Sequence, residues 1–168
     1  MAKITLGGTP VETSGQLPEI GEKAPEFHLT TTDLSTQKLS DLKGHKVVLN
    51  IFPSVDTGTC AQSVREFNKK AGKMNNTKVL CISRDLPFAQ ARFCGAEGLE
   101  HVLMLSDFKT GDFGKAYGLE FTDGPFEGLH SRCVLVLDEN GIVTYTQQVK
   151  EVGDEPNYEA SLDALLGE

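Results

Sequence analysis

A nearly continuous apolar run at residues 47–52, VVLNIF, constrains the fold of this chain more than any other feature. Such a run suits a strand that is covered on both faces, as strands are in parallel or mixed sheets. Pro53 ends the run, and residues 61–73 then place apolar side chains at helical spacing. The sequence therefore predicts a central strand, a loop and a helix, with Cys60 at the start of the helix.

The alternation of strands and helices continues along the chain. After the first helix, the apolar patterns predict a strand at residues 78–83, a helix at 87–96, a strand at 102–105, strands at 133–137 and 142–146, and a helix at 158–166. Strands that alternate with helices imply parallel βαβ units. The turn-forming residues 138–141 make the last two strands an antiparallel hairpin.

The N-terminal part adds smaller features. Residues 3–13 alternate apolar and polar side chains around Gly7 and Gly8, which predicts a β-hairpin. Short alternating runs at residues 27–30 and 37–39 indicate edge strands. Together these patterns predict a single α/β domain, residues 1–168, with the element order of the thioredoxin fold. In this fold a central mixed sheet is flanked by helices, and here a β-hairpin extension precedes it.

The charge of the chain argues against two classes of partner. The sequence has 24 acidic residues against 16 Lys and Arg, a formal net charge of -8. This charge repels both a nucleic acid backbone and an anionic membrane surface, so we expect neither as a partner. The N-terminus lacks the apolar run of a signal peptide, and no stretch approaches the roughly 20 apolar residues that span a bilayer. We therefore expect a cytoplasmic protein.

Four cysteines, at positions 60, 81, 94 and 133, are too few for a disulfide scaffold, and none forms the short-spaced pair of a zinc site or a dithiol exchanger. Cys81 and Cys133 lie in apolar strand runs, where a thiol is desolvated and inert. Cys60 begins a helix, whose unpaired backbone N–H groups favour a thiolate. By position alone, a reactive thiol and a packed apolar residue are equally good interpretations of Cys60.

The residues around Cys60 resemble a known family. The segment NIFPSVDTGTC that ends at Cys60 contains Pro53 and Thr57 in the peroxiredoxin pattern, Pro followed later by Thr-x-x-Cys. The sequences SVR, DLPFAQ and RFC follow between residues 63 and 94. With them, nearly the whole chain resembles the bacterial thiol peroxidase subfamily of the peroxiredoxins, of the atypical two-cysteine type.

This resemblance implies a function and assigns roles to residues. It implies a homodimeric peroxidase that reduces hydrogen peroxide and organic hydroperoxides, takes electrons from thioredoxin and uses neither a metal nor an organic cofactor. Cys60 would attack the peroxide, Thr57 would orient it, Arg132 would hold the thiolate and polarise the peroxide, and Pro53 would shield the sulfur from water. By position alone, Thr57 would be a helix-capping residue and Arg132 a surface arginine.

A second cysteine is expected because the attack leaves a sulfenic acid, which further peroxide oxidises irreversibly unless another thiol condenses with it. The resemblance places this resolving residue at Cys94, with an intrachain disulfide to Cys60. By position alone, Cys94 would be a packed helix residue. A disulfide needs α-carbons within roughly 7 Å. Since both cysteines lie in predicted helices, we expect the two segments to unravel during resolution.

Other functions remain open at this point. A Cys–His hydrolase would need His28, His45, His101 or His130 beside Cys60. The fold also suits a catalytically silent binding module, although such a module would not need the full set of motif residues. A redox-signalling or holdase role is compatible with peroxidase activity, because an oxidised thiol can pass its disulfide to another protein.

Overall fold

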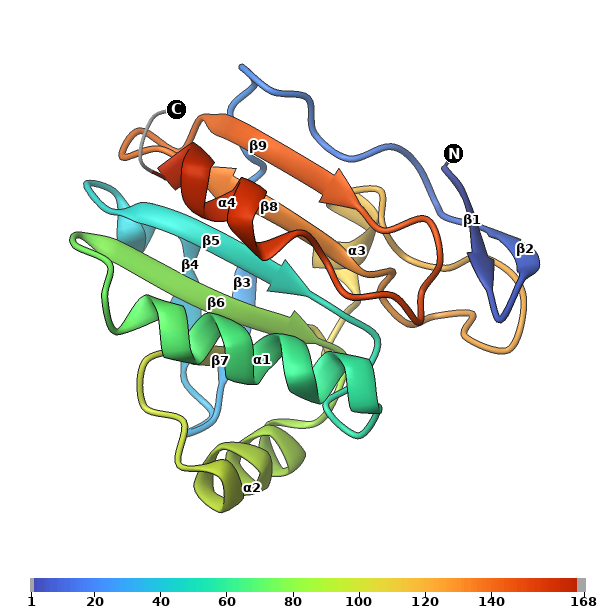
Figure 1. The fold of residues 1–168 in the computed structure, drawn as a ribbon, viewed down its shortest axis with the longest axis horizontal. Coiled ribbons are helices and arrows are strands. Elements are labelled where there is room, and N and C mark those ends of the chain that lie inside the picture. Colours follow the sequence, from blue (N-terminus) through green and yellow to red (C-terminus); the bar gives the residue numbers. More distant parts are fainter. Residues whose placement is uncertain (1, 166–168) are drawn as a thin grey trace.

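The computed structural model describes residues 2–165 and centres on a seven-stranded mixed sheet (Figure 1). The strands are β3 (His28–Thr31), β4 (Thr36–Lys38), β5 (Lys46–Ile51), β6 (Thr77–Ser83), β7 (Leu103–Ser106), β8 (Cys133–Leu137) and β9 (Val143–Gln148). Their order in the sheet is β4-β3-β7-β6-β5-β8-β9. The three central strands β5, β6 and β7 are parallel, and the outer pairings are antiparallel. The predicted mixed sheet is thereby confirmed.

The helices connect and cover these strands. They are α1 (Gly58–Ala71), α2 (Pro87–Glu97), α3 (Asp112–Ala116) and α4 (Tyr158–Leu165), with a short 3-10 helix η1 at Leu39–Leu42. Two parallel units, β5-α1-β6 and β6-α2-β7, follow one another as the sequence predicts. In Figure 1, α1 and α4 lie in front of the sheet and α3 lies behind it.

Strand β5 shows how the apolar run builds the core. It lies between β6 and β8, and successive side chains of a strand point to opposite faces of the sheet. Val48 belongs to the apolar cluster that includes Val64 and Phe67 of α1. Leu49 belongs to the cluster on the other face, which includes Phe113 of α3. Both faces of β5 are therefore buried, which explains why its sequence is apolar throughout.

The N-terminal hairpin forms a separate two-stranded sheet, β1 (Lys3–Leu6) with β2 (Thr9–Glu12). Gly7 and Gly8 make the turn with φ of 58° and 84°, backbone conformations that favour glycine. Thr5 forms a parallel bridge with Glu151, so the hairpin is joined to the segment that follows β9. The predicted hairpin is confirmed.

The structure differs from the sequence-based prediction at two smaller elements. Strand β3 was expected at an edge of the sheet, but it lies between β4 and β7. Helix α3 was not predicted, because its five residues are too few to show a helical period.

No helix in residues 2–165 combines the length and the apolar character that crossing a bilayer requires.

Candidate active site

Cys60 lies where the loop after β5 enters α1. Thr57 is the N-cap of α1, which makes Cys60 the third helical residue, within the first turn. The Cys60 side chain is fully buried, and the Ser63 hydroxyl donates a hydrogen bond of 2.8 Å to the Cys60 carbonyl. The first backbone N–H groups of a helix have no intrahelical partner and favour negative charge nearby. The local structure thus places Cys60 in the helix turn that attracts negative charge.

Arg132 comes directly before β8 and contacts the same sulfur. Its side chain is only 2 % exposed, and its Nη2 atom donates to Cys60 Sγ at 3.3 Å. Nε donates to the carbonyl of Val152 at 2.8 Å, which fixes the plane of the guanidinium. This arrangement excludes the interpretation of Arg132 as an ordinary surface arginine.

The guanidinium of Arg132 lacks two of its ordinary partners. Among the described residues no carboxylate forms an ion pair with it, and its Nη1 atom has no hydrogen-bond partner. A buried charge is normally paired because its desolvation is costly. A thiolate at Cys60 would provide the counter-charge, and Nη1 would remain as a donor for a substrate oxygen.

Pro53 and Thr57 lie in the loop between β5 and α1, which leads directly to Cys60. Pro53 is buried and Thr57 is partly exposed. The Thr57 hydroxyl does not cap α1; it donates to the carbonyl of Ser54 at 3.1 Å. Since a hydroxyl has one donor and two acceptor sites, this bond leaves its oxygen available to accept a hydrogen bond from another O–H group.

Asp85 holds the loop in place, a role that the sequence did not reveal. Its carboxylate accepts hydrogen bonds from Ser54 Oγ at 2.7 Å, from the backbone N–H of Val55 at 2.9 Å and from Ser83 Oγ at 2.6 Å. The signal was available, because Asp85 follows β6 and parallel neighbouring strands end at the same edge of a sheet. A carboxylate there can reach the loop that follows β5.

Cys94 lies in the last part of α2 and is partly buried against the same apolar cluster as Cys60. Burial raises the pKa of its thiol. Its carbonyl accepts the N–H groups of Gly98 and Leu99, which close the end of the helix. All four cysteines are free thiols. The structure therefore places Cys60 and Cys94 in one region but does not join them.

Two ion pairs connect α2 to the Cys60 region. Arg92 Nη2 lies 3.0 Å from Asp56 Oδ1 in the loop, and Arg65 Nη2 of α1 lies 2.6 Å from Glu97 Oε1. All four side chains are at least one third exposed, and exposed pairs contribute little to stability. These two pairs connect the helices in the observed arrangement, but breaking them to move α2 would cost little free energy.

Cys81 and Cys133 lie in β6 and β8, on opposite faces of the sheet. Burial raises the pKa of each thiol to about 12. The sulfur of Cys81 lies 3.6 Å from the amide Nδ2 of Asn50. The sulfur of Cys133 lies 3.4 Å from the hydroxyl of Ser131. These two cysteines are core residues in an environment that keeps them protonated.

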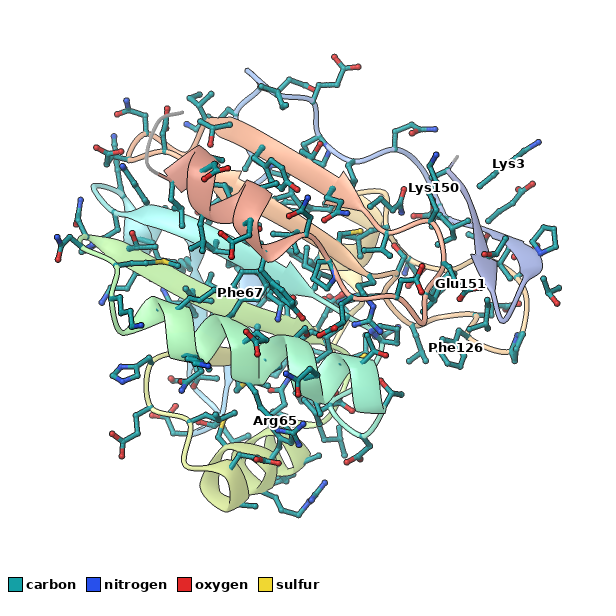
Figure 2. All side chains as sticks on the ribbon, viewed as in Figure 1. Lys3, Arg65, Phe67, Phe126, Lys150 and Glu151 are labelled. Carbon is teal, nitrogen blue, oxygen red and sulfur yellow. The ribbon has the colours of Figure 1, made fainter. Side chains whose placement is uncertain are left out.

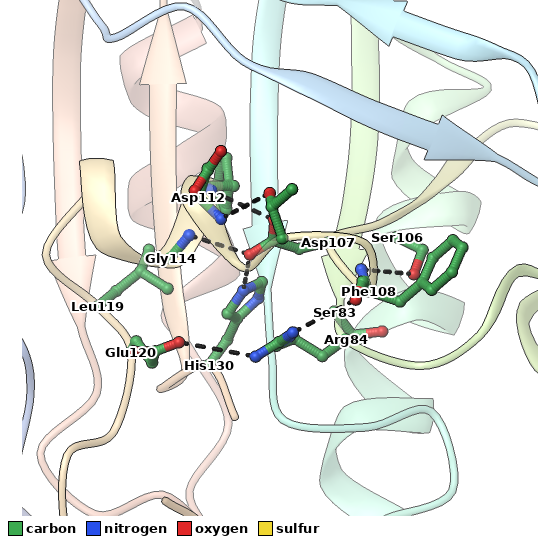
Figure 3. A network of polar contacts seen from close by, with 12 residues as sticks. Ser83, Arg84, Ser106, Asp107, Phe108, Asp112, Gly114, Leu119, Glu120 and His130 are labelled. Atoms are coloured by element: carbon green, nitrogen blue, oxygen red, sulfur yellow. Dashed lines mark hydrogen bonds and ion pairs between the residues drawn. The ribbon is translucent and has the colours of Figure 1, made fainter. Parts of the chain in front are cut away.

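The histidines do not support a Cys–His pair. His130 is fully buried, but its Nε2 atom contacts Asp107 Oδ2 at 2.9 Å, within the polar network that Figure 3 shows. The same carboxylate accepts the backbone N–H groups of Phe113 and Gly114 at the start of α3. Within residues 2–165, no histidine forms a hydrogen bond to Cys60, and no cluster of three metal-ligating side chains was found.

The chain is similar to known proteins over nearly its whole length. The Redoxin family profile matches residues 19–162. The chain is 52% identical to a thiol peroxidase of Corynebacterium glutamicum, over 98% of this chain and 99% of that protein. Its structure resembles a peroxiredoxin-like protein from Aquifex aeolicus with a TM-score of 0.94 and 34% identity, covering 99% and 97% of the two chains.

A more distant structural neighbour shows the same fold. A thiol peroxidase from Chromobacterium violaceum superposes with a TM-score of 0.91 at 23% identity, covering 99% of this chain and 96% of the other. The predicted thioredoxin-like arrangement, a seven-stranded mixed sheet with a small N-terminal hairpin, is therefore confirmed as the peroxiredoxin variant of that fold.

Proposed function

Since the chain belongs to the thiol peroxidase subfamily of the peroxiredoxins, enzymes that reduce peroxides, we propose that Cys60 is its peroxide-attacking thiol and Cys94 its resolving thiol. The observation that carries this proposal is the buried contact of 3.3 Å between Arg132 Nη2 and Cys60 Sγ. Of the three fully buried cysteines, at positions 60, 81 and 133, Cys60 is the one whose sulfur accepts a hydrogen bond from a cation.

The first step is the attack of the Cys60 thiolate on one oxygen of a hydroperoxide. The O–O bond breaks, the sulfur becomes a sulfenic acid, and the other oxygen leaves as an alkoxide or hydroxide that takes up a proton. Negative charge grows on the leaving oxygen, so donors that already point at it lower the barrier. The free Nη1 of Arg132 is such a donor, while the Thr57 hydroxyl orients the substrate and Pro53 limits the access of water.

The second step is the condensation of the Cys94 thiol with the sulfenic acid, which forms the Cys60–Cys94 disulfide and releases water. Cys94 lies near the end of α2, a helix of 11 residues of which Pro87, Gln90 and Phe93 are buried. Few buried contacts make local unfolding inexpensive. We therefore infer that the last turn of α2 and the first turn of α1 open during resolution.

The remaining parts of the proposal concern partners and setting. We propose that thioredoxin reduces the disulfide, that both hydrogen peroxide and organic hydroperoxides are substrates, and that the enzyme acts in the cytoplasm as one domain without a bound cofactor. A homodimer is supported by two large apolar side chains at the start of α2, Leu86 and Phe88, which are 52% and 67% exposed. An apolar surface next to a catalytic loop suits a protein interface.

The test is the consumption of cumene hydroperoxide coupled to thioredoxin and its reductase. We expect turnover by the wild type and none by Cys60→Ser, with Cys81→Ser as the matched control that retains activity. Replacing thioredoxin by glutathione with glutaredoxin tests the reductant. Turnover by Cys60→Ser would refute the proposal, and activity with glutathione alone would refute only the assignment of the donor.

A further inference from the structure

The segment 151–153, which follows β9, is clamped to the turn of the N-terminal hairpin by one carboxylate. Glu151 Oε1 accepts hydrogen bonds from the N–H of Gly8 at 2.8 Å and from Thr5 Oγ1 at 3.0 Å. Glu151 Oε2 accepts from the N–H of Gly7 at 3.3 Å and from the N–H of Gly153 at 3.0 Å. In Figure 2, Glu151 lies beside the hairpin at the edge of the molecule.

This clamp is built for a carboxylate. Successive N–H groups in a left-handed turn point to one side and form an anion-binding concavity, as those of Gly7 and Gly8 do here. Hydrogen bonds from the backbone of Gly153 and Gly8 lower the pKa of Glu151 to about 2, so the side chain is ionised at neutral pH. Backbone bonds of 2.7 Å from Thr5 N to the Lys150 carbonyl and 2.9 Å from Val152 N to the Thr5 carbonyl complete the attachment.

The other side of the same segment contacts the active site. The carbonyl of Val152 accepts the Nε–H of Arg132 at 2.8 Å, and the carbonyl of Gly153 accepts the hydroxyl of Thr59 at 2.8 Å. Thr59 is the neighbour of Cys60 in the first turn of α1, and Arg132 contacts the sulfur of Cys60. Two consecutive carbonyls of one short segment therefore hold the cation and the helix turn that meet at the sulfur.

We propose that Glu151 is a positioning residue for Arg132: it fixes segment 151–153 on the hairpin, and the Val152 carbonyl then sets the orientation of the guanidinium against Cys60. With Nε held, Nη2 lies on the sulfur and Nη1 is left for the peroxide. The proposal rests on the functions proposed above for Cys60 and Arg132. It gives the N-terminal hairpin a role in the reaction, although the hairpin is outside the main sheet.

The test separates peroxide attack from disulfide formation by stopped flow, in the full-length protein. We expect Glu151→Ala to lower the second-order rate constant for Cys60 oxidation roughly tenfold, because small displacements of a catalytic group are costly. The rate of disulfide formation should not fall, because the carbonyl of Gly153 holds Thr59 in the first turn of α1, the turn that opens in that step. Asp154→Asn is the matched control; within residues 2–165 its carboxylate has no hydrogen bond to segment 151–153.

Further variants keep the proposal falsifiable. If Glu151→Ala does not fold, Glu151→Gln retains one acceptor oxygen and should slow oxidation about threefold. In an Arg132→Lys background, Glu151→Ala should cause no further loss, since residues that act through one another are not additive. A wild-type oxidation rate in the variant that folds, an equal slowing of both steps, or full additivity with Arg132→Lys would overturn the proposal. Wild-type oxidation in Arg132→Lys itself would instead refute the proposed role of Arg132.

Discussion

The first turn of α1 and the interior of the sheet both contain fully buried cysteines, but they differ in what surrounds the sulfur. Cys60, Cys81 and Cys133 are all 0% exposed. In the sheet, the sulfurs of Cys81 and Cys133 meet an amide and a hydroxyl, and burial raises both pKa values to about 12. At the start of α1, the sulfur of Cys60 meets a guanidinium.

This difference shows that burial alone does not decide how a thiol behaves. Removal from water disfavours the charged form of any thiol, so a buried cysteine becomes reactive only where fixed positive charge offsets that cost. At Cys60, positive charge is supplied by the buried Arg132 and by the helix start, which is the reason for proposing it as the reactive thiol. The Cys60 sulfur and the Arg132 guanidinium stabilise each other, because either charge would be costly to bury alone.

The largest expected effect is the accumulation of a sulfenic acid on Cys60 when Cys94 is replaced. In Cys94→Ser, one equivalent of peroxide should leave a sulfenic acid on Cys60 that dimedone traps, because no thiol is positioned to condense with it. Mass spectrometry of the labelled peptides checks this. The adduct should be absent in Cys60→Ser, and an adduct on Cys81 or Cys133 would contradict the comparison between the two regions.

Weakening the cation should have the next largest effect. We expect Arg132→Lys to lower the rate constant for peroxide reduction about 10²- to 10³-fold, the usual cost of losing a transition-state donor. A lysine cannot bind the Val152 carbonyl, the sulfur and the peroxide together, since it lacks the planar fork. Stopped-flow kinetics with hydrogen peroxide measures it. Arg65→Lys, which changes an exposed ion pair of α1, should stay within twofold of the wild type.

A smaller effect should appear in the resolution step when α2 is stabilised. Gly95 is next to Cys94 in α2, and a Cβ added there would meet no atom within 4 Å. Gly95→Ala should stabilise the helix by about 0.5–1 kcal/mol, which corresponds to a roughly two- to fivefold slower formation of the disulfide if the helix must open. The rate of peroxide attack should not change. Faster or unchanged disulfide formation in a folded variant would argue against local unfolding.

The smallest effect should be seen in the cysteines of the sheet. At pH 8, iodoacetamide should leave Cys81 and Cys133 unmodified in the folded protein, because burial raises their pKa values to about 12 and blocks access. Both should react fully after unfolding in urea, as peptide mass spectrometry can show. Modification of either residue in the native protein, at a rate similar to that of Cys60, would remove the distinction between the two regions.

The sequence predicted most of the fold because its strands are strongly apolar and its turns are rich in glycine. Most of the run at 47–52 lies in β5 (Lys46–Ile51), and Gly7 and Gly8 formed the expected turn. Strand β3 was misplaced to an edge because its short run carries no information about which strand will pair beside it. Helix α3 was missed because one and a half turns show no period.

The site was predictable only in part. The resemblance identified Cys60 and Arg132, and the structure brings these two together. It did not identify Asp85 as an anchor, although the position of Asp85 directly after β6 was a signal. It did not identify Glu151 either, because this carboxylate binds mainly backbone N–H groups that no sequence pattern marks. Segment 151–153 is distant from Cys60 in the sequence, and their proximity follows only from the docking of the hairpin and the segment after β9.

The most direct test of the central claim is a map of the disulfides in the wild-type protein after one equivalent of hydrogen peroxide. The reduced protein is oxidised, blocked with an alkylating reagent, digested without reductant and analysed by mass spectrometry. We expect a single link between Cys60 and Cys94, with Cys81 and Cys133 recovered as thiols. A protein in which Cys60 stays reduced, or in which the link joins Cys94 to Cys81, would contradict the assignment of Cys60 as the peroxide-attacking thiol.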